Sequence, residues 1–255
     1  MGRERTTRTL KTTETTLEVI EALESLDGGR VSELAEELDM AASTVHAHLA
    51  TLEKHEYVAR EGDEYHLGLE FLSLGNYVGR RKPAYETAEA YTEKLASETE
   101  CRAVFMVEEH GWGVYMFTAS GAHAVWTYST VGKKVPLHVT AAGKAILSKL
   151  PEQRVRGIID RHGLKAETAN SITDPEELFA ELATIREQGY SFNSEEQLDG
   201  VRAVGVPVTD HHDRVIGSFS VASPANRLDD TAFEQDLPNT LLGIANEFEL
   251  EHTLT

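Results

Sequence analysis

The sequence predicts an α+β protein in two parts: an N-terminal three-helix unit with a β-hairpin, and a larger part around a mostly antiparallel sheet. Three observations predict it. Apolar residues recur at helical spacing up to residue 55, and two short strand-like segments then flank a turn. From residue 83 onward, strand-like runs group at both ends of a mixed segment, which favours antiparallel pairing over an alternating parallel order.

The first helix is expected to end at the Asp27-Gly28-Gly29 turn. Its apolar positions have helical spacing, at Leu17, Ile20, Leu23 and Leu26. Thr15 and Glu18 have the spacing of a capping box, in which two side chains bond the free backbone N–H groups of a helix start. We therefore expect the helix to begin near Thr15.

Two further helices and a hairpin complete the N-terminal part. Ser32 is expected to cap a short helix over residues 33–38, and a third helix follows from about Ser43 to His55. Its inward positions are Val45, Leu49 and Leu52. The segments 57–60 and 64–67 then alternate as strands around the turn 61–63. Three helices followed by a hairpin describe a winged helix-turn-helix, expected over residues 1–68.

A boundary is expected after an apolar-periodic stretch over residues 69–78. The stretch ends in two arginines, Lys82 and Pro83, a cationic last turn followed by a helix breaker. Residues 69–82 are therefore a predicted linker helix, and residues 83–255 a second domain. Its expected strands are 103–107, 114–118, 124–128, 204–208 and 215–221, and its expected helices are 141–150, 152–161, 175–188 and 231–251.

The net charge of -19 is unusual for a protein that binds nucleic acid, because such binding rests on cations that neutralise phosphates. Either the chain does not bind DNA, or its whole surface is acidic for solubility in high salt and binding is confined to a local patch. Acidic residues are scattered through every segment, which favours a halophilic source. Such a local patch is expected at residues 1–11, which contain four cations, Arg3, Arg5, Arg8 and Lys11, and only one acidic residue, Glu4.

The third helix is the element that a helix-turn-helix inserts into the major groove. Ser43, Thr44, His46 and Ala47 are its expected outward positions, and short hydroxyl and imidazole side chains can reach phosphates and base edges. The alternative is a three-helix module that contacts another protein, since winged helices also serve in protein docking.

Several motifs resemble one family. VSELAEEL (31–38) followed by STVHAHLATL (43–52) resembles the helix-turn-helix of the IclR family of bacterial and archaeal regulators. In the second part, PLHVTAAGKAIL (136–147) is similar to that family's strand-to-helix junction. GYSFNSEE (189–196), GVRAVGVPV (200–208) and IGSFSVASP (216–224) resemble its second signature. The resemblance covers almost the whole chain, with the motifs in the family's order.

The resemblance implies a transcription regulator that binds a pseudo-palindromic operator in double-stranded DNA as a homodimer or tetramer, with a GAF/PAS-like effector-binding domain. The expected DNA contacts are Ser43, Thr44, His46, Ala47, His48 and Thr51 on the third helix, Arg60 in the wing, and Arg3, Arg5 and Arg8 in an arm along the backbone or minor groove. Family members commonly carry cations at the positions of Ala42 and Ala47, so phosphate contact from this helix is expected to be weaker here.

The effector site is expected where Thr140 precedes a helix of small residues. The free N–H groups and the dipole of a helix start favour an anion, which suggests a carboxylate effector. The alternative is close packing of a small-residue helix start. The resemblance implies a cavity between this helix start and the later strands, lined by Thr140, Ala141, Ala142, Asn193, Ala203, Ser220 and Ala222, with Trp126 as an aromatic wall.

Other classes of function find little support. The single Cys101 forms neither an internal disulfide nor a cysteine metal site, and His211 and His212 fit a solvated turn better than a metal site. A catalytic domain fused to a DNA-docking module would need a nucleophile that the sequence does not offer. No apolar run approaches the roughly 20 residues of a membrane helix. We expect a cytoplasmic protein without enzymatic activity, metal, cofactor or membrane attachment.

Overall fold

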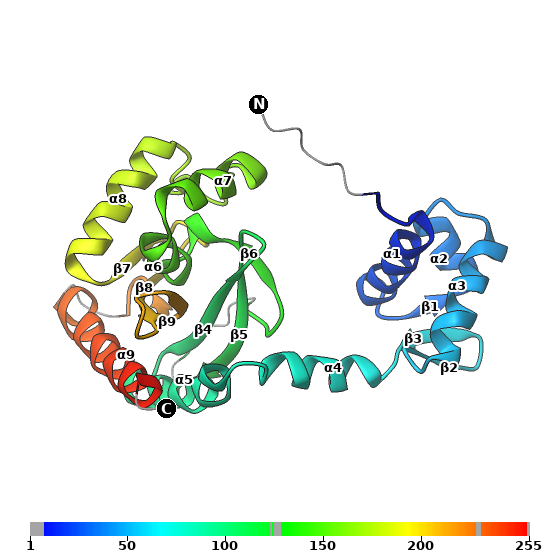
Figure 1. Cartoon of the computed structure of the whole chain (residues 1–255), viewed down its shortest axis with the longest axis horizontal. Coiled ribbons are helices and arrows are strands. Elements are labelled where there is room, and N and C mark those ends of the chain that lie inside the picture. The colour runs from blue at the N-terminus through cyan, green and yellow to red at the C-terminus, as the bar shows by residue number, and fades with distance from the viewer. Residues whose placement is uncertain (1–7, 123, 125–128, 228–230, 254–255) are drawn as a thin grey trace. The chain divides into compact units, whose positions relative to one another are not determined.

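The computed structural model describes residues 8–122, 124, 129–227 and 231–253. The chain divides into two compact units, Met1–Arg80 and Arg81–Thr255, which we call unit 1 and unit 2 (Figure 1). Each unit has its own hydrophobic core, so each is described by itself.

Unit 1 holds three helices and a hairpin, followed by a further helix. Its elements are α1 (Lys11–Ser25), β1 (Gly29–Arg30), α2 (Val31–Glu37), α3 (Ala42–Lys54), β2 (Val58–Glu61), β3 (Glu64–Leu67) and α4 (Glu70–Gly79). Strands β2 and β3 pair antiparallel from Val58 opposite Leu67 to Glu61 opposite Glu64. The core joins α1, α2 and α3 to the hairpin through Leu23, Leu34 and Leu49. The predicted winged helix-turn-helix is confirmed.

The expected helix starts in unit 1 were wrong by up to one turn. Helix α1 begins at Lys11, so Thr15 lies inside it and is buried, with no capping box at its start. Leu17 is 54% exposed, because the buried face of α1 runs through Val19 and Leu23. Ser32 does not cap α2, which begins at Val31; the Glu33 carboxylate instead accepts the Arg30 backbone N–H at 2.7 Å. The buried face of α1 therefore consists mostly of residues smaller than the leucines and isoleucine that the spacing predicted.

Unit 2 is built around one antiparallel sheet. Its elements are α5 (Pro83–Thr99), β4 (Arg102–Glu109), β5 (Trp112–Ser120), β6 (Lys134–Pro136), a 3-10 turn (Leu137–Val139), α6 (Ala141–Lys149), α7 (Glu152–His162), α8 (Pro175–Gln188), β7 (Ser191–Ser194), β8 (Val201–Thr209), β9 (Val215–Pro224), a π-helical turn (Ala232–Asp236) and α9 (Leu237–Thr253). Within the described residues, the strand order is β6-β5-β4-β9-β8-β7, and every pair is antiparallel.

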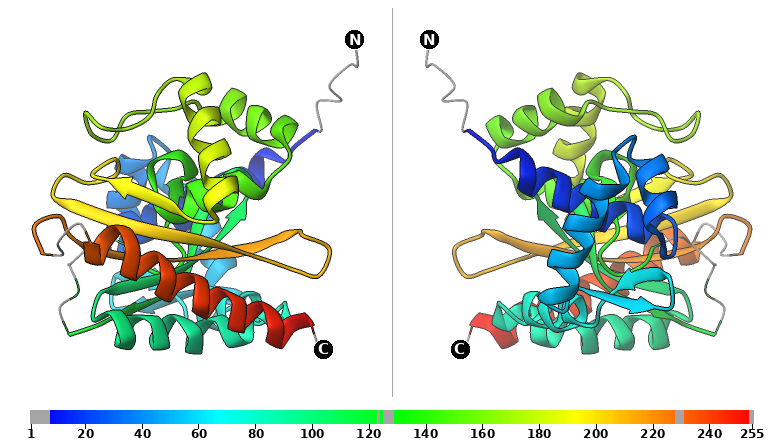
Figure 2. Two further views of the ribbon diagram at one scale, coloured as in Figure 1. Left: turned by 90° about the vertical axis from the view of Figure 1, so that its left-hand side faces the viewer. Right: turned by 90° about the vertical axis from the view of Figure 1, so that its right-hand side faces the viewer.

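Alternate residues of the strands face two different layers of helices. Phe105 and Phe219 pack on one face against α5 and α9, whereas Met106 packs on the other face with α6, α7 and α8. Figure 2 shows the sheet between these two layers. The expected α+β class with an antiparallel sheet is confirmed.

Helix α5 and two short strands, β6 and β7, were not predicted in unit 2. Helix α5 begins directly at Pro83, which occupies the first helical turn, where its missing N–H costs nothing. The buried face of α5 includes Ala84, Ala88 and Ala96, small residues whose periodicity is weak in a polar sequence. Strands β6 and β7 are only three and four residues long. The strand expected over 124–128 lies outside the described residues, apart from Ala124, which is in no strand.

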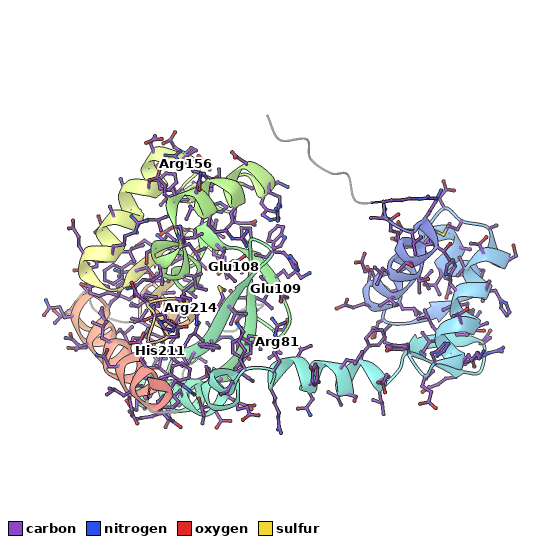
Figure 3. The ribbon with its side chains drawn as sticks, in the orientation of Figure 1. Arg81, Glu108, Glu109, Arg156, His211 and Arg214 are labelled. Atoms are coloured by element: carbon purple, nitrogen blue, oxygen red, sulfur yellow. The ribbon has the colours of Figure 1, made fainter. Side chains whose placement is uncertain are left out.

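The turn between β8 and β9 is held by its own ion pair. The Asp210 carboxylate accepts the backbone N–H groups of His212 and Arg214 and lies 2.7 Å from the Arg214 guanidinium. Figure 3 labels His211 and Arg214 in this turn. The hydrogen bond from Arg214 holds the pKa of Asp210 below its ordinary value. Asp210 is therefore engaged in closing the hairpin.

Among the described residues, no helix combines the length and the apolar character needed to cross a membrane.

Candidate functional site

Helix α3 presents short side chains to solvent along one face. Ser43, Thr44, His46, Ala47 and Thr51 are all exposed, while Val45 and Leu49 between them are buried. The Thr51 hydroxyl donates to the carbonyl oxygen of Ala47 at 2.8 Å. This exposed face leaves the Ser43 and Thr44 hydroxyls on the first turn, the part of a recognition helix that reaches base edges.

His48 differs from the other predicted contacts on α3. Its ring is half-buried, and its Nδ1 lies 2.9 Å from the Thr16 hydroxyl of α1. The structure thus places His48 at the contact between α1 and α3.

The hairpin carries one fixed cation. The Nε of Arg60 donates to the carbonyl oxygen of Gly62 at 3.0 Å, and the guanidinium lies 5.5 Å from the centre of the Tyr65 ring. Arg8 is exposed before the start of α1. Arg3 and Arg5 lie outside the described residues.

Unit 2 contains a cavity of about 350 Å³ between the start of α6 and the sheet. A volume of this size suits a small organic ligand. Seven predicted effector-site residues line it: Thr140, Ala141, Ala142, Asn193, Ala203, Ser220 and Ala222. The eighth, Trp126, lies outside the described residues.

The start of α6 forms one wall of the cavity. The Thr140 hydroxyl accepts the Gly143 backbone N–H at 2.9 Å, so the predicted cap is present. Gly205 of β8 permits the close approach of α6, because a Cβ at Gly205 would lie 2.6 Å from the carbonyl carbon of Ala141. The backbone N–H groups of Ala141 and Ala142 belong to the first turn, where they have no carbonyl partner within the helix. This end of the helix favours an anion.

Asn193 and Ser220 are already engaged with the backbone. The Asn193 amide donates to the carbonyl oxygen of Val139, and its side-chain oxygen accepts the Glu196 backbone N–H at 3.1 Å. The Ser220 hydroxyl donates to the carbonyl oxygen of Val204 at 2.7 Å. Asn193 therefore positions the α6 start, and Ser220 keeps only acceptor capacity for a ligand.

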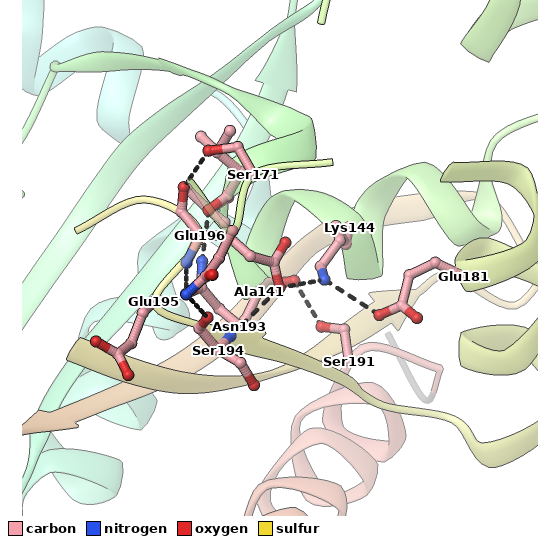
Figure 4. A network of polar contacts seen from close by, with 12 residues as sticks. Ala141, Lys144, Ser171, Glu181, Ser191, Asn193, Ser194, Glu195 and Glu196 are labelled. Carbon is pink, nitrogen blue, oxygen red and sulfur yellow. Dashed lines mark hydrogen bonds and ion pairs between the residues drawn. The ribbon is translucent and has the colours of Figure 1, made fainter. Parts of the chain in front are cut away.

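A buried ion network, which sequence analysis missed, anchors the other side of α6 (Figure 4). The Lys144 ammonium lies 2.8 Å from a Glu196 carboxylate oxygen and 3.1 Å from Glu181. The Lys144 side chain is only 2% exposed, and the second Glu196 oxygen has no hydrogen-bond partner among the residues that the structure describes. The network joins α6, α8 and the segment after β7.

Cationic residues also line the cavity. Of the described residues that line it, Arg102, Lys133 and Lys134 carry positive charges and Glu167 alone carries a carboxylate. The Nε of Arg102 donates to the Ser129 hydroxyl at 2.6 Å, and its Nη1 donates to the Ser120 hydroxyl at 3.0 Å. Burial lowers the pKa of Arg102. Arg102 lies two residues before Val104, and residues two apart on a strand face the same side of the sheet. This spacing could have indicated that Arg102 lines the cavity together with Val104.

Tyr115 supplies an aromatic part of the cavity wall. Burial raises the pKa of its phenol, and the Gln197 amide lies 3.4 Å from the phenol oxygen. The phenol is therefore neutral at ordinary pH and available as a polar group beside Arg102.

Comparisons with known proteins agree over both units. The family model for the IclR helix-turn-helix domain matches residues 12–62, and that for the C-terminal part of the bacterial transcriptional regulator IclR matches residues 76–248. An HTH-type transcriptional regulator from Halobacterium salinarum, ArcR, is 34% identical over 227 residues, 88% of this chain and 86% of its own. That source agrees with the acidic composition.

Two solved structures are also similar. The Thermotoga maritima IclR crystal structure has a TM-score of 0.80 and 27% identity, and covers 95% of this chain and 99% of its own. The inducer-binding domain of the Acinetobacter transcription factor PobR, solved as a double mutant with 3-hydroxybenzoic acid, has a TM-score of 0.60 and 26% identity. It covers 64% of this chain and 96% of its own.

Proposed function

The chain belongs to the IclR family of transcription regulators, and on that premise we propose that it binds an operator through α3 and senses a small carboxylate in the cavity of unit 2. The observation that supports carboxylate sensing is the cavity itself. It is bounded by a helix start and lined by more cations than carboxylates, in a protein whose net charge is -19.

We propose that residues 1–68 form the DNA-binding domain, residues 69–82 the linker helix and residues 83–255 the effector-binding domain. Ser43, Thr44, His46 and Ala47 contact the operator, while Arg60 and the arm with Arg3, Arg5 and Arg8 contact phosphates. Thr51 supports the same face, and His48 orients it from behind. Since a regulator acts on the chromosome, the protein belongs in the cytoplasm.

A mobility shift at high salt tests this function. The full chain is mixed with DNA from the region upstream of its own gene and with unrelated DNA, with and without small organic acids. We expect preferential retardation of the upstream DNA and a change in its affinity with at least one acid, a coupling of about 1–3 kcal/mol. A winged helix that docks only on proteins would retard neither DNA at any salt concentration.

Arginine at position 47 is expected to strengthen DNA binding. Ala47 is exposed on α3, so a cation there can neutralise one more phosphate and steepen the slope of log K against log salt by about 0.9. Anisotropy of a labelled operator over a KCl series measures the slope. The matched variant Ala47→Glu should weaken binding. Equal slopes for Ala47→Arg and the wild type would place position 47 away from DNA.

Helix α4 supports the proposed homodimer. None of its residues is buried; Leu72 and Tyr77 are 71% and 72% exposed, while Phe71 contacts Tyr57 of the wing at 5.3 Å between rings. Leu10, directly before α1, and Leu17, on α1, are also exposed. Several large apolar side chains exposed on one short helix favour a protein contact, and a two-fold operator calls for a second copy of the same chain.

The double variant Leu72→Glu, Tyr77→Glu is expected to dissociate the oligomer and to weaken operator affinity by at least about tenfold, because like charges would meet across the two-fold axis. Light scattering measures the mass. Glu70→Gln in the same helix, which leaves the apolar residues in place, is the control. A wild-type chain that is monomeric at all concentrations would contradict the proposal.

A further inference from the structure

Arg102 stands at one end of a row of residues that crosses the floor of the cavity. In the sheet register, Arg102 on β4 lies opposite Ala222 on β9, Ala222 lies opposite Ala203 on β8, and Ala203 lies opposite Asn193 on β7. All four line the cavity. The two alanines between the ends project only a methyl group, so the space above them stays open.

The positive charge of Arg102 has no anionic partner within the described part of the chain. Its hydrogen bonds go to Ser120 and Ser129, which are neutral. Arg102 is half-buried, so its charge is partly removed from water, and an anionic partner would offset that loss of solvation. The guanidinium offers two N–H groups in one plane, a geometry that matches a carboxylate.

The second anion-favouring group lies at the other end of the cavity. The first turn of α6 packs on Gly205 of β8. Arg102 is the first residue of β4, and β8 lies two strands away from β4 in the sheet. Neighbouring strands are about 4.8 Å apart, so the two ends are separated by roughly 10 Å across the sheet. A ligand with one carboxylate cannot occupy both ends.

We propose that the effector is a dicarboxylate that spans the cavity, with one carboxylate at the N–H groups of Ala141 and Ala142 and the other on the Arg102 guanidinium. This inference rests on the proposed effector role of the cavity. Ala222 and Ala203 accommodate the carbon chain or ring between the two charges. Arg102 is thus the residue that selects diacids over monoacids.

Calorimetry on the full chain tests the selection with matched acids: glutarate, adipate and isophthalate against pentanoate, hexanoate and benzoate. We expect at least one diacid to bind about 10- to 100-fold more tightly than its monoacid, the range for a hydrogen bond to a charged group. In Arg102→Gln this preference should disappear, while monoacid affinity remains. Arg102→Lys, which keeps the charge but not the planar pair of donors, should retain part of it.

Retained monoacid affinity in Arg102→Gln shows that the cavity is intact. A wild type that binds monoacids as tightly as diacids, or an Arg102→Gln variant that keeps the diacid preference, overturns this inference while the effector role stands. If no acid of either kind binds the wild type, both the inference and the carboxylate-sensing function fail. Operator binding, measured on the same samples by mobility shift, separately reports the DNA-binding function.

Discussion

Replacing Lys144 with methionine is expected to lower the free energy of unfolding of unit 2 by about 3–5 kcal/mol, the usual cost of removing one partner from a buried ion pair. Methionine fills much of the volume of lysine without its charge. The Glu196 carboxylate, 9% exposed, would then keep the Ser194 backbone N–H at 3.3 Å as a partner but lose its only cation among the described residues.

Tryptophan fluorescence in urea measures this loss in unit 2 alone, because both tryptophans, Trp112 and Trp126, belong to that unit. Lys149→Met is the matched control on the same helix. Lys149 lies 3.5 Å from the exposed Asp213, so its loss should cost at most about 1 kcal/mol.

The double variant Lys144→Met, Glu196→Gln should recover part of the stability, since it removes the stranded charge as well. If Lys144→Met were no less stable than Lys149→Met, the buried network would not be what holds α6 in place. The cavity wall would then need another anchor.

The double variant Ser43→Ala, Thr44→Ala is expected to reduce operator affinity roughly 100-fold or more, at about 1–3 kcal/mol for each lost contact to a base. Both hydroxyls are exposed at the start of α3, and alanine favours the helix, so the fold should be unaffected. Anisotropy titration with a labelled operator measures the affinity.

Thr12→Ala, Thr13→Ala is the matched control, because it removes two exposed hydroxyls from α1 of the same unit. The salt dependence distinguishes the kind of contact. Removing neutral hydroxyls should leave the slope of log K against log salt unchanged, whereas Arg60→Ala should reduce it by about 0.9. Wild-type affinity in the Ser43, Thr44 variant would mean that another element reads the operator.

Elements with strong local signals were predictable from the sequence. The expected third helix differs from α3 by one residue at each end, and the Thr140 cap and the bounds of α8 are as expected. Helix α5 was missed because three of its six buried residues are alanines and a fourth is Thr92, which together give little apolar contrast. Apolar spacing alone is therefore a weak signal where small or polar residues share the buried face of a helix and no cap marks its start.

The polar groups inside unit 2 were harder to predict. Lys144 lies on a helix in a position that sequence reading assigns to solvent, yet it is buried because Glu196, far along the chain, provides its partner. Asn193 lines the cavity as expected, but the sequence did not indicate that its side-chain amide also bonds the backbone of Val139 and Glu196. Both features depend on contacts between distant segments, which one sequence does not contain.

Selection of fragments from the genomic DNA of the source organism tests the central claim most directly. The full chain is incubated with sheared DNA at high salt, with and without the organic acid that binds it most tightly, and the retained fragments are sequenced. We expect a small set of fragments that share a pseudo-palindromic site, an enrichment that changes with the acid and disappears in the Ser43, Thr44 variant. Equal retention of all fragments, by wild type and variant alike, would contradict sequence-specific regulation by this protein.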